Sequence, residues 1–158
     1  MRYALVYGLI AGAIAIGVII AGMIFAPGSR VFQSVWFGYL VMIVSMTFIF
    51  AGVRRYRDLE KGGVIRFQPA LGMGLAIAAV AVLAYVLIWE IYLAATHYAF
   101  IDHYFGGSDP ESVAWRGWYS NPLNRLWMTT QELGPVGLVM AFFSAALLRN
   151  PRLLPARR

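Results

Sequence analysis

Four long apolar runs alternate with short segments that hold almost all of the charged residues. The runs cover residues 3–26, 35–53, 69–92 and 126–148. A helix needs about 20 mostly apolar residues to cross the hydrocarbon core of a bilayer, and the runs reach or approach that length. The pattern predicts an all-α integral membrane protein, with four transmembrane helices that form one domain over residues 1–158.

Composition supports this prediction and removes several kinds of site. Hydrophobic residues make up 61% of the chain. Charged residues make up 13%, against about 25% in a typical soluble domain. The chain contains no cysteine, which excludes disulfides, thiolate catalysis and cysteine metal sites. The connections between the runs are too short to hold a second globular domain.

Positive charges are distributed unevenly over the two sides of a four-span arrangement. Arg30, Arg116 and Arg125 lie on one side. The other ten cations lie on the opposite side, with both termini: Arg2, Arg54, Arg55, Arg57, Lys61, Arg66, Arg149, Arg152, Arg157 and Arg158. Because Lys and Arg concentrate in cytoplasmic connections, we predict that both termini are cytoplasmic. Topology therefore explains the net charge of +6 without nucleic acid. The same cations can hold anionic lipid headgroups, at about 1 kcal/mol each.

Small residues recur at a four-residue spacing in three of the four runs. In lipid, this spacing lets two helix backbones approach closely. The residues are Gly8 and Gly12 in the first run, Gly74 and Ala78 in the third, and Gly137 and Ala141 in the fourth. They can pack helices of one chain together, or they can bind a second copy or another membrane protein. The spacing alone does not choose between these possibilities.

The first two connections carry clear turn signals. Pro27-Gly28 predicts a turn after the first run. The connection after the second run is predicted to be a cytoplasmic loop, because it lies on the side that holds most of the cations. Its distinctive residues are Arg55, Tyr56, Arg57, Gly62 and Gly63. The arginines favour a helix C-terminus, and the two glycines permit the chain to reverse.

The third connection is predicted to contain a short interfacial helix. The third spanning helix is expected to continue through His97 to about Phe105. Ser108 and Glu111 then stand at capping-box spacing and predict a new helix start. This helix is expected to lie in the outer headgroup layer. The aromatic rings that would anchor it there are Trp115, Trp118 and Tyr119.

The last helix is predicted to begin before the fourth apolar run. Asn121 is a favourable N-cap, and Pro122 suits the first helical position. Pro135 lies inside the predicted helix, where it removes a backbone hydrogen bond and should produce a kink near Gln131.

Polar residues near the outer ends of the third and fourth helices form a candidate site. Ionisable groups at membrane depth are costly and usually functional. Glu90 and His97 are seven residues apart and lie on one face of the third helix. Arg125, Thr129 and Glu132 share one face of the fourth helix, and these two faces could meet. The predicted polar cluster consists of Glu90, His97, Arg125, Thr129 and Glu132.

Three interpretations of this cluster remain open. It could be a structural latch, in which Arg125 or His97 neutralises a carboxylate. It could be a proton or ion relay. It could also be a metal site built from Glu90, His97, Glu132 and His103. Known metal sites on helices usually have ligands more closely spaced, such as two histidines on adjacent turns, and this chain has no such pair. We therefore expect no metal and no cofactor.

No catalytic signature occurs in the chain, so we expect a protein that is not an enzyme. The leading interpretation is an accessory or scaffolding subunit that packs against other membrane proteins through the small-residue positions. The alternative is a small oligomeric transporter, or an ion- or proton-coupled protein, that uses Glu90 and Glu132. An enzyme that acts on lipid at the outer interface is a third, weaker possibility.

Several segments together resemble a known family of bacterial membrane proteins, the domain-of-unknown-function family 4199. The segments are Arg55-Tyr56-Arg57-Asp58, Gly62-Gly63-Val64-Ile65-Arg66-Phe67, Trp89-Glu90-Ile91-Tyr92, Asn121-Pro122 and Pro135-Val136-Gly137-Leu138, together with Glu132. The resemblance covers nearly the whole chain. It implies four spans with cytoplasmic termini in the bacterial inner membrane, and it implies no particular activity.

Overall fold

A computed structural model describes residues 1–26, 28–32 and 34–150. The described residues form six helices and no strand. The helices are α1 (Arg2–Phe25), α2 (Val35–Glu60), α3 (Phe67–Ala95), α4 (Ala99–Tyr104), α5 (Pro110–Ser120) and α6 (Pro122–Leu148). The predicted turn residue Pro27 and the predicted inner cations Arg152, Arg157 and Arg158 lie outside the described residues.

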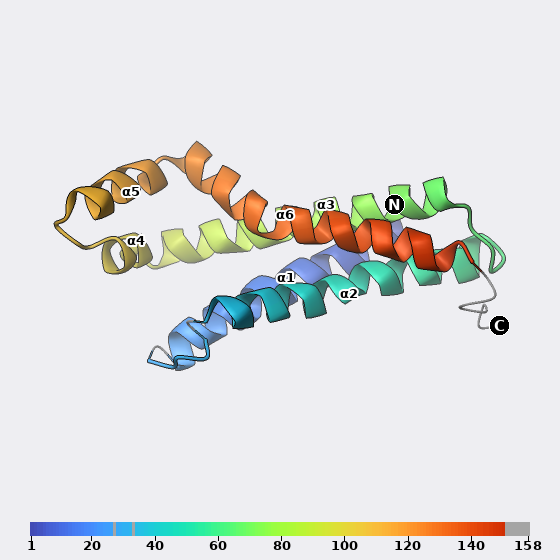
Figure 1. Cartoon of the computed structure of the whole chain (residues 1–158), viewed down its shortest axis with the longest axis horizontal. Coiled ribbons are helices and arrows are strands. Elements are labelled where there is room, and N and C mark those ends of the chain that lie inside the picture. The colour runs from blue at the N-terminus through green and yellow to red at the C-terminus, as the bar shows by residue number, and fades with distance from the viewer. Residues whose placement is uncertain (27, 33, 151–158) are drawn as a thin grey trace.

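The four long helices lie side by side along the molecule (Figure 1). Helices α1, α2, α3 and α6 are each long and apolar enough to cross a membrane. This confirms the predicted all-α fold with four candidate spans. Figure 1 shows that α1 begins and α6 ends at one end of the bundle, which we call the terminal end. Helices α4 and α5 lie at the opposite end, which we call the cap end.

Close packing of α3 against two neighbours uses the small residues. A Cβ atom on Gly12 would meet the backbone carbonyl of Ala81, and one on Gly8 would lie 2.7 Å from the Ile77 carbonyl oxygen. A Cβ atom on Gly74 would lie 3.0 Å from the Cβ of Ala141, and one on Gly137 would lie 3.1 Å from the Cβ of Ala78. The small-residue positions therefore join α1 to α3 and α3 to α6 within the chain, so they do not form an open surface for a partner.

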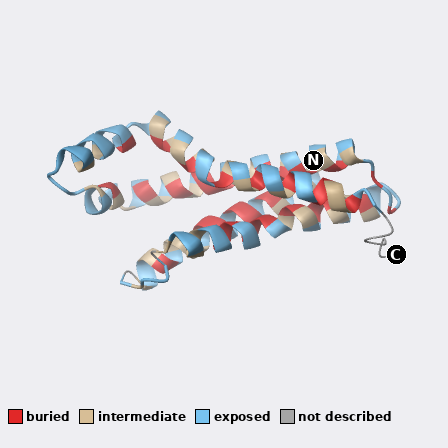
Figure 2. Ribbon diagram, in the orientation of Figure 1, coloured by how far each residue is buried: buried red, intermediate tan, exposed pale blue. Residues whose placement is uncertain are grey.

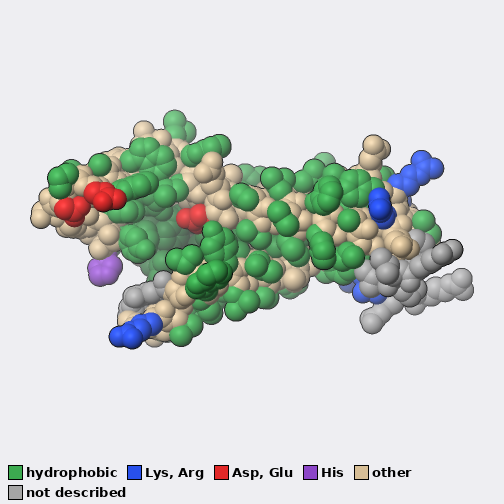
Figure 3. Space-filling model, viewed as in Figure 1, with side chains coloured by type: hydrophobic (Ala, Val, Ile, Leu, Met, Phe, Trp, Pro, Cys, Tyr) green, Lys and Arg blue, Asp and Glu red, His purple; other side chains and the backbone are tan. Residues whose placement is uncertain are grey.

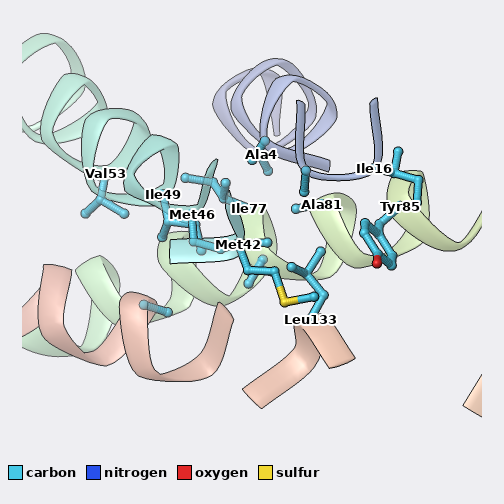
Figure 4. Packing of buried hydrophobic residues seen from close by; sticks show 14 of the residues in the cluster. Ala4, Ile16, Met42, Met46, Ile49, Val53, Ile77, Ala81, Tyr85 and Leu133 are labelled. Carbon is cyan, nitrogen blue, oxygen red and sulfur yellow. The ribbon is translucent and has the colours of Figure 1, made fainter. Parts of the chain in front are cut away.

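Large apolar side chains fill the remaining space between the helices. Met46, Ile49, Ile77 and Leu133 are completely buried where α2, α3 and α6 meet. Figure 4 shows Met42 of α2 directed toward Leu133 of α6. In Figure 2, the buried positions follow the facing sides of the long helices, whereas α5 is mostly exposed.

The outside of the bundle is largely apolar as well. Leu5, Leu40, Leu83, Leu138 and Phe142 are each more than half exposed. Figure 3 shows hydrophobic side chains along the middle of the molecule, with Lys and Arg groups toward its two ends. Water would not favour so much exposed apolar surface, but lipid tails would.

Two predicted helix boundaries in the third connection are wrong. Helix α3 ends at Ala95 because His97 (φ 50°) and Tyr98 (φ 59°) adopt left-handed backbone conformations. The Tyr98 N–H donates to the Leu93 carbonyl and closes the helix end. The segment that was expected to continue α3 becomes the separate helix α4.

The capping residue of α5 also differs from the prediction. Ser108 and Glu111 do not form the expected capping box. Instead, Asp109 is the N-cap, and its carboxylate accepts from the Ser112 N–H at 2.9 Å. The Ser112 hydrogen bonds hold the pKa of Asp109 below its ordinary value. One residue of displacement places Pro110 at the first turn, where its missing N–H is harmless.

Helix α6 follows the prediction at its start and contains the expected proline. The Asn121 side chain accepts from the Leu123 N–H at 3.0 Å, and Pro122 follows in the first turn. Pro135 lies inside the helix. Figure 1 shows α6 changing direction between its orange first part and its red second part. A proline in the helix interior accounts for such a bend.

Candidate functional site

A partly buried ion pair joins α3 to α6 at the cap end. Arg125 Nε lies 2.7 Å from Glu90 Oε1, and Arg125 Nη2 lies 2.8 Å from Glu90 Oε2. The arginine side chain is 3% exposed and the glutamate side chain is 23% exposed. Two parallel, short, charge-assisted hydrogen bonds are the strongest geometry available to this pair.

Arg125 also binds the connection between α5 and α6. Its Nη1 donates to the Tyr119 carbonyl at 3.2 Å and lies 3.5 Å from the Ser120 carbonyl. Its guanidinium carbon lies 5.2 Å from the centre of the Tyr98 ring, within the range of a cation–π contact. Arg125 therefore holds together α3, the turn after α3, the end of α5 and the start of α6. We call Glu90 and Arg125 the latch.

The other members of the predicted polar cluster do not join the latch. Thr129 is buried, and its hydroxyl donates to the Arg125 backbone carbonyl at 2.9 Å within the same helix. His97 is exposed in the left-handed turn after α3. Glu132 is seven residues beyond Arg125, about 10 Å along the helix axis, which is too far for Arg125 to bind both carboxylates. The structure thus pairs Glu90 with Arg125 and places His97 and Glu132 apart from that pair.

Glu132 contacts a residue that the sequence reasoning did not select. Its Oε2 accepts from the Tyr85 hydroxyl at 3.2 Å. Tyr85 is buried, whereas the glutamate remains exposed at the protein surface. None of the ion pairs among the described residues includes Glu132. The described residues also contain no group of three or more His, Cys, Asp or Glu side chains placed to hold a metal ion.

Glu132 and Tyr85 line a cavity of about 310 Å³ near the cap end. All six helices contribute to its wall. The lining residues are Ile16, Ile19, Met23, Val35, Gly38, Tyr39, Met42, Tyr85, Trp89, Phe100, Tyr119 and Glu132. The cavity lies where the α1–α2 pair diverges from α3 and α6, a divergence that Figure 1 shows. Figure 3 shows a hollow between these parts with hydrophobic side chains at its floor. We call this space the cap-end cavity.

A buried hydrogen bond supports one wall of the cap-end cavity. Trp89 Nε1 donates to the Tyr119 hydroxyl at 3.1 Å, and both residues are less than 9% exposed. The Phe100 ring packs edge-on against Trp89, with 5.1 Å between ring centres. Burial raises the pKa of Tyr119 above its ordinary value, which already lies well above physiological pH, so the hydroxyl is neutral there. Tyr119 was expected to anchor α5 in the headgroup layer, but it points inward.

Removal of the Tyr119 hydroxyl should measurably destabilise this wall. The Tyr119→Phe variant leaves the buried Trp89 N–H without its acceptor, which should cost about 1–3 kcal/mol of unfolding free energy. Denaturant titration in mixed micelles would measure the loss. Tyr104→Phe, at a residue 70% exposed, is the control and should be close to neutral. Equal stabilities of the two variants would contradict a role for this hydrogen bond.

The predicted loop residues lie at the terminal end, away from the cavity. Helix α2 continues past Arg55 to Glu60, and Gly62 (φ 64°) and Gly63 (φ 88°) then reverse the chain in left-handed conformations. Arg57 is completely buried, and its Nε lies 2.7 Å from Asp58 Oδ1.

Tyr56 packs edge-on against Tyr3 of α1, with ring centres 5.9 Å apart. The Lys61 ammonium nitrogen lies 5.6 Å from the centre of the Tyr56 ring. These contacts stabilise the end of α2 and the turn into α3, and they assign no chemistry to this loop.

Sequence reasoning missed most of the cap-end cavity. Tyr85 and Trp89 are four residues apart in α3 and share one face, whereas the selected Glu90 is rotated by about 100°. A tyrosine hydroxyl within an apolar span is a signal that could have identified Tyr85. Tyr39, Phe100 and Tyr119 could not have been grouped with it, because they come from three other helices.

Comparison with known proteins agrees with the fold and provides no activity. No curated protein and no solved structure matches this chain. A family model described as "Protein of unknown function (DUF4199)" matches residues 6–150, which is most of the chain. The chain therefore belongs to the domain-of-unknown-function family 4199.

Proposed function

We propose that this protein is a non-enzymatic accessory protein of the bacterial inner membrane, and that it acts by binding a small hydrophobic molecule in the cap-end cavity. The observation that carries the proposal is the cavity itself, with an apolar and aromatic wall and one carboxylate. Such a combination is typical of small-molecule sites, in which a few polar groups orient a ligand within an apolar wall.

The latch supports a structural role for Glu90 rather than a chemical one. Its carboxylate already forms two hydrogen bonds with Arg125, and a group fixed in this way is poorly placed to exchange protons or ions. Absence of catalytic motifs in the sequence is consistent with binding without catalysis. We further propose that both termini are cytoplasmic, because most cations then lie on the cytoplasmic side, where they can contact anionic lipid headgroups.

Association with other membrane proteins, or with a second copy, remains part of the proposed accessory role. The small-residue positions are occupied within the chain. A partner would therefore contact the larger apolar side chains on the outside of the bundle, such as Leu83 and Phe142. Nucleic acid is not a proposed partner.

Occlusion of the cavity tests the binding role. Gly38 lines the cavity, and a Cβ atom there would meet nothing within 4 Å. The Gly38→Phe variant should therefore fill the cavity without displacing the helices. After mild-detergent purification, native mass spectrometry should detect a retained small molecule on the wild type and not on Gly38→Phe.

A matched control is available on α1. A Cβ atom on Gly17 would also meet nothing within 4 Å, but this residue does not line the cavity. Gly17→Phe should retain the small molecule. If Gly38→Phe carries the same molecule as the wild type, the cap-end cavity is not the binding site and the proposal is wrong.

An ion- or proton-coupled protein is the second candidate, and one observation favours it. Glu132 has a hydroxyl partner and no ion pair among the described residues, so its carboxylate could change protonation state. This candidate now uses Glu132 without Glu90. Four spans are few for a transport path, so a symmetric homo-oligomer with water beside Glu132 would support it over the accessory role.

A further inference from the structure

We infer that the ligand of the cap-end cavity is an amphipathic organic cation, with one ammonium group and an apolar body. This inference rests on the proposed binding function and adds the chemical class of the ligand. It follows from the charge, the aromatic wall and the size of the cavity.

The charge of the cavity is the first argument. Among the lining residues, Glu132 is the one acid, and none is Lys, Arg or His. Arg125 does not compensate it, because that side chain is held by Glu90. The Tyr85 hydroxyl supplies only a neutral hydrogen bond, so the Glu132 carboxylate has no partner of opposite charge among the residues that line the cavity. A positively charged ligand would complete the pair.

The aromatic wall is the second argument. Tyr39, Trp89, Phe100 and Tyr119 line the same space as Glu132. The faces of aromatic rings attract ammonium groups, and rings grouped around a carboxylate are a known means of recognising them. An anionic ligand would meet the negative carboxylate of Glu132, so this lining disfavours it.

The size and position of the cavity set the rest of the ligand. A volume of about 310 Å³ lies at the small end of the range for ligand sites. It suits an ammonium group with a short apolar body, which can contact Ile16, Met23 and Met42. A longer alkyl chain would extend from the cavity into the bilayer beside the diverging helices. The ligand should therefore enter from the membrane.

Two chain-matched amphiphiles can test the charge requirement. The probes are decyltrimethylammonium, which is cationic, and decyldimethylamine oxide, whose dipolar N–O group has no net charge at pH 8. Both are titrated into the full-length protein in maltoside micelles, and native mass spectrometry measures occupancy. The cation should saturate at one molecule per chain and bind more tightly than the oxide.

Matched variants at carboxylates complete the design. Glu132→Gln should weaken binding of the cation by about tenfold or more, because it removes a charge-assisted contact. It should leave binding of the oxide unchanged. Glu111→Gln, at an exposed carboxylate of α5, should change neither. Glutamine can still accept from Tyr85, so Glu132→Gln is expected to fold, and its thermal unfolding midpoint verifies this.

The outcomes separate this inference from the proposed function. If cation and oxide bind equally, or Glu132→Gln binds the cation as tightly as wild type, the cavity binds apolar molecules without charge recognition, and the inference is overturned alone. If Gly38→Phe binds both probes like wild type, or the wild type binds neither, the inference and the proposed site are overturned together.

Discussion

Replacement of Arg125 by methionine is expected to lower the unfolding free energy by about 3 kcal/mol. Removal of one partner from a buried ion pair leaves an uncompensated charge, which typically costs about 3–5 kcal/mol. The lower part of that range applies because the Glu90 side chain keeps 23% exposure and some contact with solvent. Arg125→Met also removes the hydrogen bonds to the carbonyls that end α5. Denaturant titration in mixed micelles would measure the change.

Replacing both Glu90 and Arg125 tests whether the loss of stability comes from their pairing or from any substitution in this region. Glu90→Gln with Arg125→Met removes both charges, so the loss should be clearly smaller than the sum of the two single losses. Arg116→Met is the control, since its Nη2 lies 3.9 Å from Asp102 Oδ1 and both side chains are well exposed. It should cost no more than about 1 kcal/mol. Equal losses for Arg125→Met and Arg116→Met would refute the latch.

Alanine at Gly12 should destabilise the packing of α1 against α3 by about 1–3 kcal/mol. The added Cβ meets the Ala81 backbone carbonyl and lies 2.9 Å from the Ala84 Cβ. Backbone atoms cannot rotate away as a flexible side chain can, so the two helices must separate. The same substitution at Gly74 should cost less, because its closest contact is 3.0 Å and is to the Ala141 side chain.

Gly17 supplies the control within the same helix. Nothing lies within 4 Å of its Cβ position, so Gly17→Ala adds no overlap and should stabilise the helix by up to about 1 kcal/mol. Unfolding midpoints of both variants in the same detergent would make the comparison. Destabilisation by both substitutions to the same degree would show that backbone propensity, not close approach to α3, controls the result.

The pattern of Gly8 and Gly12 shows what helical spacing can and cannot specify. Gly8 and Gly12 were predicted to allow a close approach, and they do so. The neighbour in that approach is α3 of the same chain, although spacing alone equally permitted a partner protein. Spacing describes one helix face, whereas the identity of the opposing face depends on how all the helices fold together.

The polar residues give a similar comparison. Spacing correctly put Glu90 and Arg125 within reach of each other at the ends of α3 and α6. It also grouped His97 with Glu90 on the assumption of a continuous helix, and the left-handed turn at His97 and Tyr98 breaks that continuity. Glu132 shares a face with Arg125, yet the distance along the axis separates the two.

The sequence by itself determined the number of candidate spans, the approximate starts of the long helices and the family. These properties depend on the length and apolar content of continuous segments, because a bilayer requires about 20 apolar residues whatever the neighbouring helices do. Caps at Asn121 and the glycine pair at Gly62 were equally readable, since they act within a few residues of the chain.

Only the tertiary structure decided which side chains share a site. The cap-end cavity combines Tyr39 of α2, Tyr85 of α3, Tyr119 of α5 and Glu132 of α6. These residues are as many as 93 positions apart, from Tyr39 to Glu132. Their proximity follows from the divergence of the α1–α2 pair from α3 and α6, and from the rotation of each helix about its own axis. Neither property is encoded in the spacing along any one helix, because both depend on packing between helices.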